Sequence, residues 1–199
     1  MNSALQCHTS PYTAFMHETK VDLGNVIQLH VEVGGKTEDP PILLIMGLGA
    51  QMLYWPDFFC KSLIDQGYRV IRYDNRDIGL SSKIRHKGPR LNTYKMMGRF
   101  SLGLQNHGAP YNLFDMADDA ALLLERLGIE KAEVIGASMG GMIAQILAAK
   151  YADRVNNLGL LFTSNNQPFL PPPFPKQLFS LLERPKSQDE NSIVDHSLK

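Results

Sequence analysis

The fold of this chain is decided by the stretch Gly136-Ala137-Ser138-Met139-Gly140. An apolar run at residues 132–135 precedes it, and a helical pattern begins at Gly141. A strand that turns sharply into a helix strains the residue at the apex, and only small neighbours allow such close approach. G-x-S-x-G in this setting is typical of a nucleophilic serine. We therefore expect Ser138 to be a nucleophile, and a plain Gly/Ser-rich turn is the alternative.

A nucleophilic serine also needs backbone donors for the oxyanion that forms during acyl transfer. The helix after Ser138 directs its N-terminus toward that oxyanion, so the N–H of Met139 is the first expected donor. The second is expected from the loop that follows the apolar run at residues 42–46. In that loop glycines flank Leu48, whose N–H is the preferred donor, and the Gly49 N–H is the alternative.

Apolar strands alternate with amphipathic helices along most of the chain. The first strand has period-two alternation, which indicates an antiparallel hairpin, and the later runs are continuously apolar, as in strands covered on both faces. Such alternation predicts right-handed crossovers and an α/β architecture. The expected strands lie at residues 27–33, 42–46, 68–73, 133–135 and 158–162, and the expected helices at 56–64, 113–127 and from Ser138 to about 151.

The composition excludes several classes of protein. Of the 199 residues, 44% are hydrophobic and 20% charged, as in an ordinary globular domain. Lysine and arginine number 20, as do aspartate and glutamate, so the zero net charge gives no reason to expect nucleic-acid or membrane binding. No run of 18 apolar residues is present. A small neutral substrate fits the zero net charge best.

The two cysteines, Cys7 and Cys60, suggest neither a disulfide framework nor a metal site. The N-terminus lacks the basic and apolar regions of a secretory signal. We therefore expect a cytoplasmic protein that uses no metal and no other cofactor.

Two segments interrupt the alternation. Residues 82–110 carry lysines and arginines but no acidic residue, which indicates a solvated loop or, alternatively, the border of a substrate pocket. Residues 167–199 begin with a proline-rich stretch and continue into a short expected helix at 176–182 and a polar tail. The expected organisation is thus a core over residues 1–166, with the excursion at 82–110, followed by a proline-rich exit that starts a lid or a disordered tail.

Three motifs in succession resemble the signatures of bacterial α/β-hydrolases, in particular the aclacinomycin methylesterase-like group and its carboxylesterase and peptidase relatives. They are MGLG at residues 46–49, YDNRDIGLSS at 73–82 and GASMGG at 136–141. The resemblance extends over about residues 20–175. It implies an α/β-hydrolase fold, with a mostly parallel sheet and helices on both faces, and hydrolysis of carboxylic esters through a Ser138 acyl-enzyme.

Within the second motif, the resemblance gives Asp74 and Arg76 a structural role rather than a catalytic one. A carboxylate and a guanidinium at these positions tie down the turn after the strand.

The chain departs from this family in its acid and base. The family order is serine, then an acid, then a histidine. The only histidine after Ser138 is His196, which lies in a polar tail, and no carboxylate stands at the end of the expected strand at 158–162. His30 is expected on the exposed face of its strand, and the remaining histidines lie in tails or loops: His8, His17, His86 and His107. The acid and base are therefore unassigned and expected to be absent. We expect the N-terminal part of a longer hydrolase that lacks the last strands and helices.

Three hypotheses for the function follow from these motifs. The leading hypothesis is a serine hydrolase acting on a small-molecule ester. The second is a truncated, inactive hydrolase fold that acts at most as a binding module. The third is a dinucleotide-binding protein, because Gly47 and Gly49 follow a strand, but the third glycine position is Met52, which makes that fingerprint weak. The oligomeric state cannot be determined from the sequence.

Overall fold

The computed structural model describes residues 8–9, 15–24, 26–84, 109–165 and 167. All of these except Gln167 belong to one compact unit, which contains the sheet and its helices. Most of the expected excursion at 82–110, and the expected helix at 176–182, lie outside the described residues.

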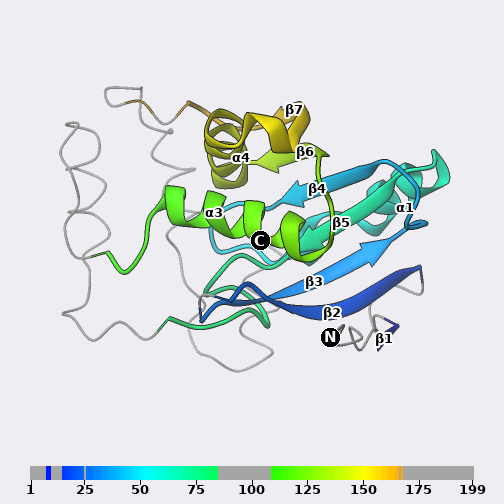
Figure 1. Ribbon diagram of the computed structural model, residues 1–199, viewed down its shortest axis with the longest axis horizontal. Coiled ribbons are helices and arrows are strands. Elements are labelled where there is room, and N and C mark those ends of the chain that lie inside the picture. The colour runs from blue at the N-terminus through cyan, green and yellow to red at the C-terminus, as the bar shows by residue number, and fades with distance from the viewer. Residues whose placement is uncertain (1–7, 10–14, 25, 85–108, 166, 168–199) are drawn as a thin grey trace, which may run out of the picture. The chain divides into compact units, whose positions relative to one another are not determined.

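Seven strands form one sheet in the order β1-β2-β3-β5-β4-β6-β7 (Figure 1). Strands β5, β4, β6 and β7 are parallel to one another, whereas β1, β2 and β3 join them as an antiparallel extension. The predicted hairpin is the β2–β3 pair, and the strand predicted at residues 42–46 is β4, which lies between β5 and β6. The bounds are β1 (His8–Thr9), β2 (Met16–Asp22), β3 (Gln28–Gly34), β4 (Pro41–Ile45), β5 (Arg69–Tyr73), β6 (Ala132–Ala137) and β7 (Val155–Leu161).

Helix α3 (Leu113–Arg126) begins and ends at residues suited to those positions. The Asn112 side chain accepts hydrogen bonds from N–H groups of the first turn, and the Asp115 carboxylate accepts one from the Asn112 N–H, which makes a capping box. Gly128 follows α3 with a φ of 68°. The other elements are α1 (Asp57–Asp65), α4 (Met139–Lys150) and the 3₁₀ turns Met52–Tyr54 and Ala152–Arg154.

Alternate residues of β4 face two separate cores. Leu43 and Ile45 pack in the core that contains α3 and α4, while Ile42 and Leu44 pack in the core that contains α1. The sheet is therefore covered by helices on both faces, as its continuously apolar strands predicted. No helix among the described residues is long and apolar enough to cross a membrane.

A buried ion pair lies on the α1 face of the sheet. The Arg72 and Glu32 side chains are fully buried, and their charged atoms are 2.6 Å apart. Arg72 also donates to the Trp55 carbonyl at 2.7 Å and lies 3.3 Å from the Asp57 carboxylate. Because each charge compensates the other out of water, removing one leaves the other buried without this close partner.

We expect Glu32→Gln to lower the free energy of unfolding by about 3–5 kcal/mol, since it leaves the Arg72 charge without its closest partner. Urea denaturation monitored by circular dichroism measures this. Lys61→Ala, which breaks the exposed Lys61–Asp65 pair on α1, is the control and costs less than about 1 kcal/mol. Equal losses in the two variants would contradict the assignment.

Candidate active site

Ser138 occupies the apex of the turn between β6 and α4. Its φ is 54° and its ψ is −122°, and its side chain is exposed. A non-glycine residue in this region of φ carries strain of about 1–3 kcal/mol, which persists only when the surroundings hold it. A Cβ at Gly136 would overlap the Gly140 carbonyl, and one at Gly140 would overlap the Ile45 carbonyl. The motif's glycines are therefore required by close packing.

The loop after β4 lies against Ser138. A Cβ at Gly47 would be 3.0 Å from the Ser138 Cβ and 3.4 Å from its Oγ. The Gly47 carbonyl accepts a hydrogen bond from the Ala50 N–H at 3.4 Å, and Gly49 has a φ of 71°. These two features are typical of a type II turn, with Leu48 at its first central position. The hydrogen bond that closes this turn joins Gly47 and Ala50, so it does not involve the Leu48 N–H.

Two consecutive residues after β5 hold this loop at both ends. The Asn75 side chain donates to the Met46 carbonyl at 2.9 Å. The Asp74 carboxylate accepts the Met52 N–H at 2.8 Å and the Leu80 N–H at 3.1 Å. Asp74 therefore fixes both its own turn and the far end of the loop that carries Leu48.

The expectation that His30 is exposed was wrong. It is 3% exposed, and its ring nitrogens lie 3.2 Å from the Asp74 carboxylate and 2.7 Å from that of Glu18. The turn after β5 covers this end of β3, because the Ser81 hydroxyl accepts the His30 N–H. Polar alternation along β3 marks a buried polar face whose partners come from β2, β5 and the turn after β5, and the sequence alone does not show those partners.

This network shifts the pKa values of two of its members. Burial alone lowers the pKa of His30, but its hydrogen bonds with Asp74 and Glu18 outweigh burial and raise the pKa above 6.5. Burial raises the pKa of Asp74, but the hydrogen bonds from His30 and from the Met52 and Leu80 N–H groups hold it below its ordinary value. The hydrogen bond between the two groups thus favours the charged form of each, the His30 imidazolium and the Asp74 carboxylate.

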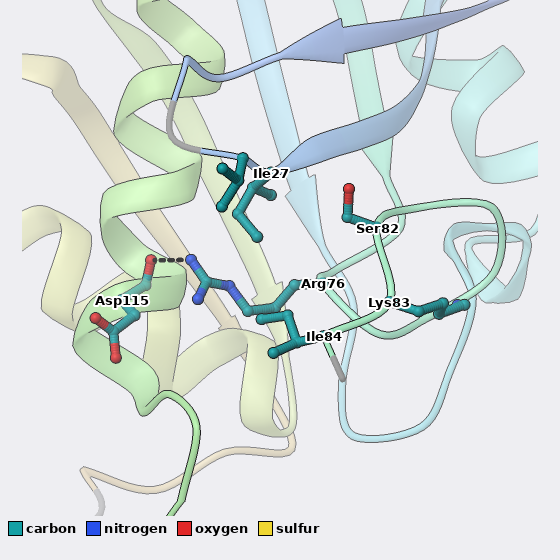
Figure 2. A pocket seen from close by; sticks show the side chains of 7 residues that line it. Ile27, Arg76, Ser82, Lys83, Ile84 and Asp115 are labelled. Carbon is teal, nitrogen blue, oxygen red and sulfur yellow. Dashed lines mark hydrogen bonds between the residues drawn. The ribbon is translucent and has the colours of Figure 1, made fainter. Parts of the chain in front are cut away.

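Arg76 is engaged away from Ser138. Its Nε and Nη2 donate to both carboxylate oxygens of Asp119 on α3, each at 2.6 Å, and Nη2 also donates to the Asp115 carbonyl at 3.2 Å. Figure 2 shows Arg76 pointing toward Asp115 of α3. Arg76 and Ile27 both line a cavity of about 440 Å³. Arg76 therefore links the turn after β5 to α3.

Among the described residues, no side chain hydrogen-bonds to the Ser138 Oγ. Of the histidines whose side chains are described, His17 is exposed on β2 and His30 is held by two carboxylates. The side chains of His8, His86, His107 and His196 lie outside the described residues.

Two residues that the sequence analysis did not single out contact this turn. The Thr163 hydroxyl donates to the Ser138 carbonyl at 2.7 Å. The Gln145 side chain on α4 donates to the Gly141 carbonyl at 3.1 Å and to the Ser164 carbonyl at 2.8 Å. In the sequence, Thr163 is one residue of a polar stretch after an apolar strand, and Gln145 is a polar residue within an expected helix. Neither pattern predicts these contacts.

The chain belongs to the alpha/beta hydrolase fold family, because the sequence model of that family matches residues 40–196. It is 32% identical over 143 residues to rhodomycin D methylesterase DnrP of Streptomyces peucetius, a match over 72% of this chain and 41% of that protein. It is 31% identical over 134 residues to the AB hydrolase superfamily protein YfhM of Bacillus subtilis, over 67% and 39%. The chain thus spans about two fifths of the length of these curated relatives.

Solved structures show the same fold. The enol-lactonase of Burkholderia xenovorans has a TM-score of 0.55 and 27% identity, over 70% of this chain and 45% of that one. Cfl2 of Burkholderia cenocepacia has a TM-score of 0.69 over 90% and 53%, and at 19% identity it shows the fold alone. The fold class and the resemblance to the α/β-hydrolase family stated from the sequence are confirmed.

We expect His30 to contribute its full share to the free energy of unfolding below pH 6.5, and this contribution to be lost as the pH rises through the raised pKa of the ring. The reason is that both carboxylates bind the charged form of the ring. Glu18→Gln removes one carboxylate, so it lowers the His30 pKa and moves this loss to lower pH. NMR titration of the ring and urea unfolding between pH 5.5 and about 9 measure both effects. His17→Gln, on the opposite face of β2, is the control. An unchanged His30 pKa in Glu18→Gln would contradict the interpretation.

Proposed function

We propose that this chain is a serine hydrolase of small-molecule carboxylic esters and reacts through a Ser138 acyl-enzyme. The observation that carries the proposal is the strained, exposed Ser138 at the N-terminus of α4, directly beside the glycine-lined loop after β4. Among the relatives, DnrP is named a methylesterase, which favours an ester as substrate.

In the proposed reaction the Ser138 Oγ attacks the ester carbonyl carbon while a general base takes the hydroxyl proton. The carbonyl oxygen becomes an oxyanion, the tetrahedral intermediate releases the alcohol, and water then hydrolyses the acyl-serine. None of the described side chains supplies the base, so the proposal places the acid and base outside the described residues.

The proposed oxyanion donors are the N–H groups of Met139 and Leu48. Met139 is the first residue of α4, so its N–H has no acceptor within the helix and adds to the positive end of the helix dipole. The Leu48 N–H is not used by its own turn, and the adjacent Gly47 is in contact with Ser138. Two such donors stabilise charge that develops only in the transition state.

Asp74 and Arg76 have a structural role in this proposal. Asp74 holds the loop that carries Leu48, and Arg76 ties the same turn to Asp119 on α3. Both act on the positions of other groups and neither contacts the reacting atoms.

A second candidate function is a binding module that retains the nucleophile turn without activating it. The observation in its favour is that no described histidine or carboxylate hydrogen-bonds to Ser138. Such a chain would bind its ligand without turning it over.

We expect a fluorophosphonate probe to label the intact chain at Ser138, and p-nitrophenyl acetate to be hydrolysed, because an activated serine attacks both reagents. Ser138→Ala should lose labelling and turnover, whereas Ser62→Ala, which removes an exposed hydroxyl on α1, should retain both. Mass spectrometry locates the label and absorbance follows the release of nitrophenol.

The outcomes separate the two candidates. Labelling that persists in Ser138→Ala overturns the assignment of the nucleophile. An intact, folded chain that neither labels nor turns over ester supports the binding module instead.

A further inference from the structure

The loop that follows β7, residues 162–165, contacts the backbone of the nucleophile turn; we refer to it as the β7 loop. The Ser138 N–H donates to the Leu161 carbonyl at 2.9 Å, which continues the parallel β6–β7 pairing as far as the serine itself. One residue into the β7 loop, the Thr163 hydroxyl donates to the Ser138 carbonyl at 2.7 Å. Both backbone polar groups of Ser138 are therefore bonded to the end of β7 or the β7 loop.

The Thr163 side chain is confined where it makes this bond. A Cβ at Gly141 would be 2.6 Å from the Thr163 Cγ2 and 2.7 Å from its Oγ1, so the threonine packs on the bare backbone of the first turn of α4. The Gln145 side chain bridges the same turn to the loop through the Gly141 and Ser164 carbonyls. The hydroxyl is thus aimed at Ser138 from a loop tied to α4 at a second point.

The Ser138 carbonyl belongs to the same planar peptide unit as the Met139 N–H, and the two point in opposite directions. Fixing the oxygen therefore fixes the direction of the N–H. The oxygen also accepts the Gly141 N–H at 3.0 Å and the Met142 N–H at 3.4 Å, both from α4 itself. Among the described residues, Thr163 supplies the shortest hydrogen bond to this oxygen and the one that comes from outside α4. A hydrogen bond to the oxygen polarises the N–H of the same peptide unit.

We propose that Thr163 is a positioning residue that sets and polarises the Met139 N–H for the oxyanion. The proposed effect on catalysis rests on the proposed function, whereas the proposed effect on the Ser138–Met139 peptide unit does not. Thr163 contacts the turn from the β7 side, and it acts on the reaction only through the Ser138–Met139 peptide.

The test is a matched pair of variants. Thr163→Val keeps the branched shape that packs on Gly141 but removes the donor, and Thr163→Ser keeps the donor. With ¹⁵N-methionine labelling, the Met139 amide proton is expected to move upfield in Thr163→Val and to return toward its original position in Thr163→Ser. The Met52 amide, which donates to Asp74, is the internal reference and should remain unchanged in both.

The kinetic readout uses the same variants. Thr163→Val is expected to lower kcat on p-nitrophenyl acetate, and the fluorophosphonate labelling rate, by about 10-fold with KM unchanged. This is less than the effect of removing an oxyanion donor outright, because the Met139 N–H is displaced rather than lost. Thr163→Ser is expected to restore both rates.

The proposal is overturned if the Met139 amide does not move in Thr163→Val, or if Thr163→Ser behaves as Thr163→Val does. A uniform loss of thermal stability in both variants, with no selective shift at Met139, would likewise overturn it in favour of a packing role. If the wild-type chain is not labelled at Ser138, the proposed function fails, and the Met139 shift still decides whether Thr163 sets this peptide unit.

Discussion

The first turn of α4 lies directly on the carboxyl end of β4, with no space for a side chain between Gly140 and the Ile45 carbonyl. This contact brings the N-terminus of the helix over the loop that follows β4. Ser138, the residue immediately before α4, has a positive φ of 54° at this junction. The exposure of Ser138, its contact with Gly47 and the direction of the helix dipole all depend on this close approach.

Around that contact the chain uses buried polar groups to fix positions that apolar packing alone would leave adjustable. Asp74 joins His30 on β3 to Met52 after β4, and Arg76 joins the same turn to α3. Buried charges of this kind add little net stability, since desolvation offsets most of their attraction. What they provide is geometry, because each hydrogen bond is satisfied in only one arrangement of the strands and turns.

The sequence predicted those parts of the fold that depend on local patterns. The run at 42–46 became a strand covered on both faces because its apolar residues alternate between the two, and the amphipathic pattern at 113–127 became a helix whose first-turn N–H groups the Asn112 side chain caps. His30 was misjudged because polar alternation was equated with exposure. Thr163 was missed because it lies 25 residues from Ser138 in sequence, and their contact depends on the register of β7.

Strain alone does not distinguish Ser138, because Val26, Asp77 and Phe162 also have positive φ values. The difference lies in what surrounds each residue. Val26 and Phe162 carry apolar side chains that are 97% and 94% exposed, whereas Ser138 combines the strain with an exposed hydroxyl, a helix N-terminus and a glycine-lined loop. A fold that served only for binding would tolerate glycine at this position with less strain. Serine held there by Thr163, Leu161 and α4 therefore favours chemistry as the reason for the geometry.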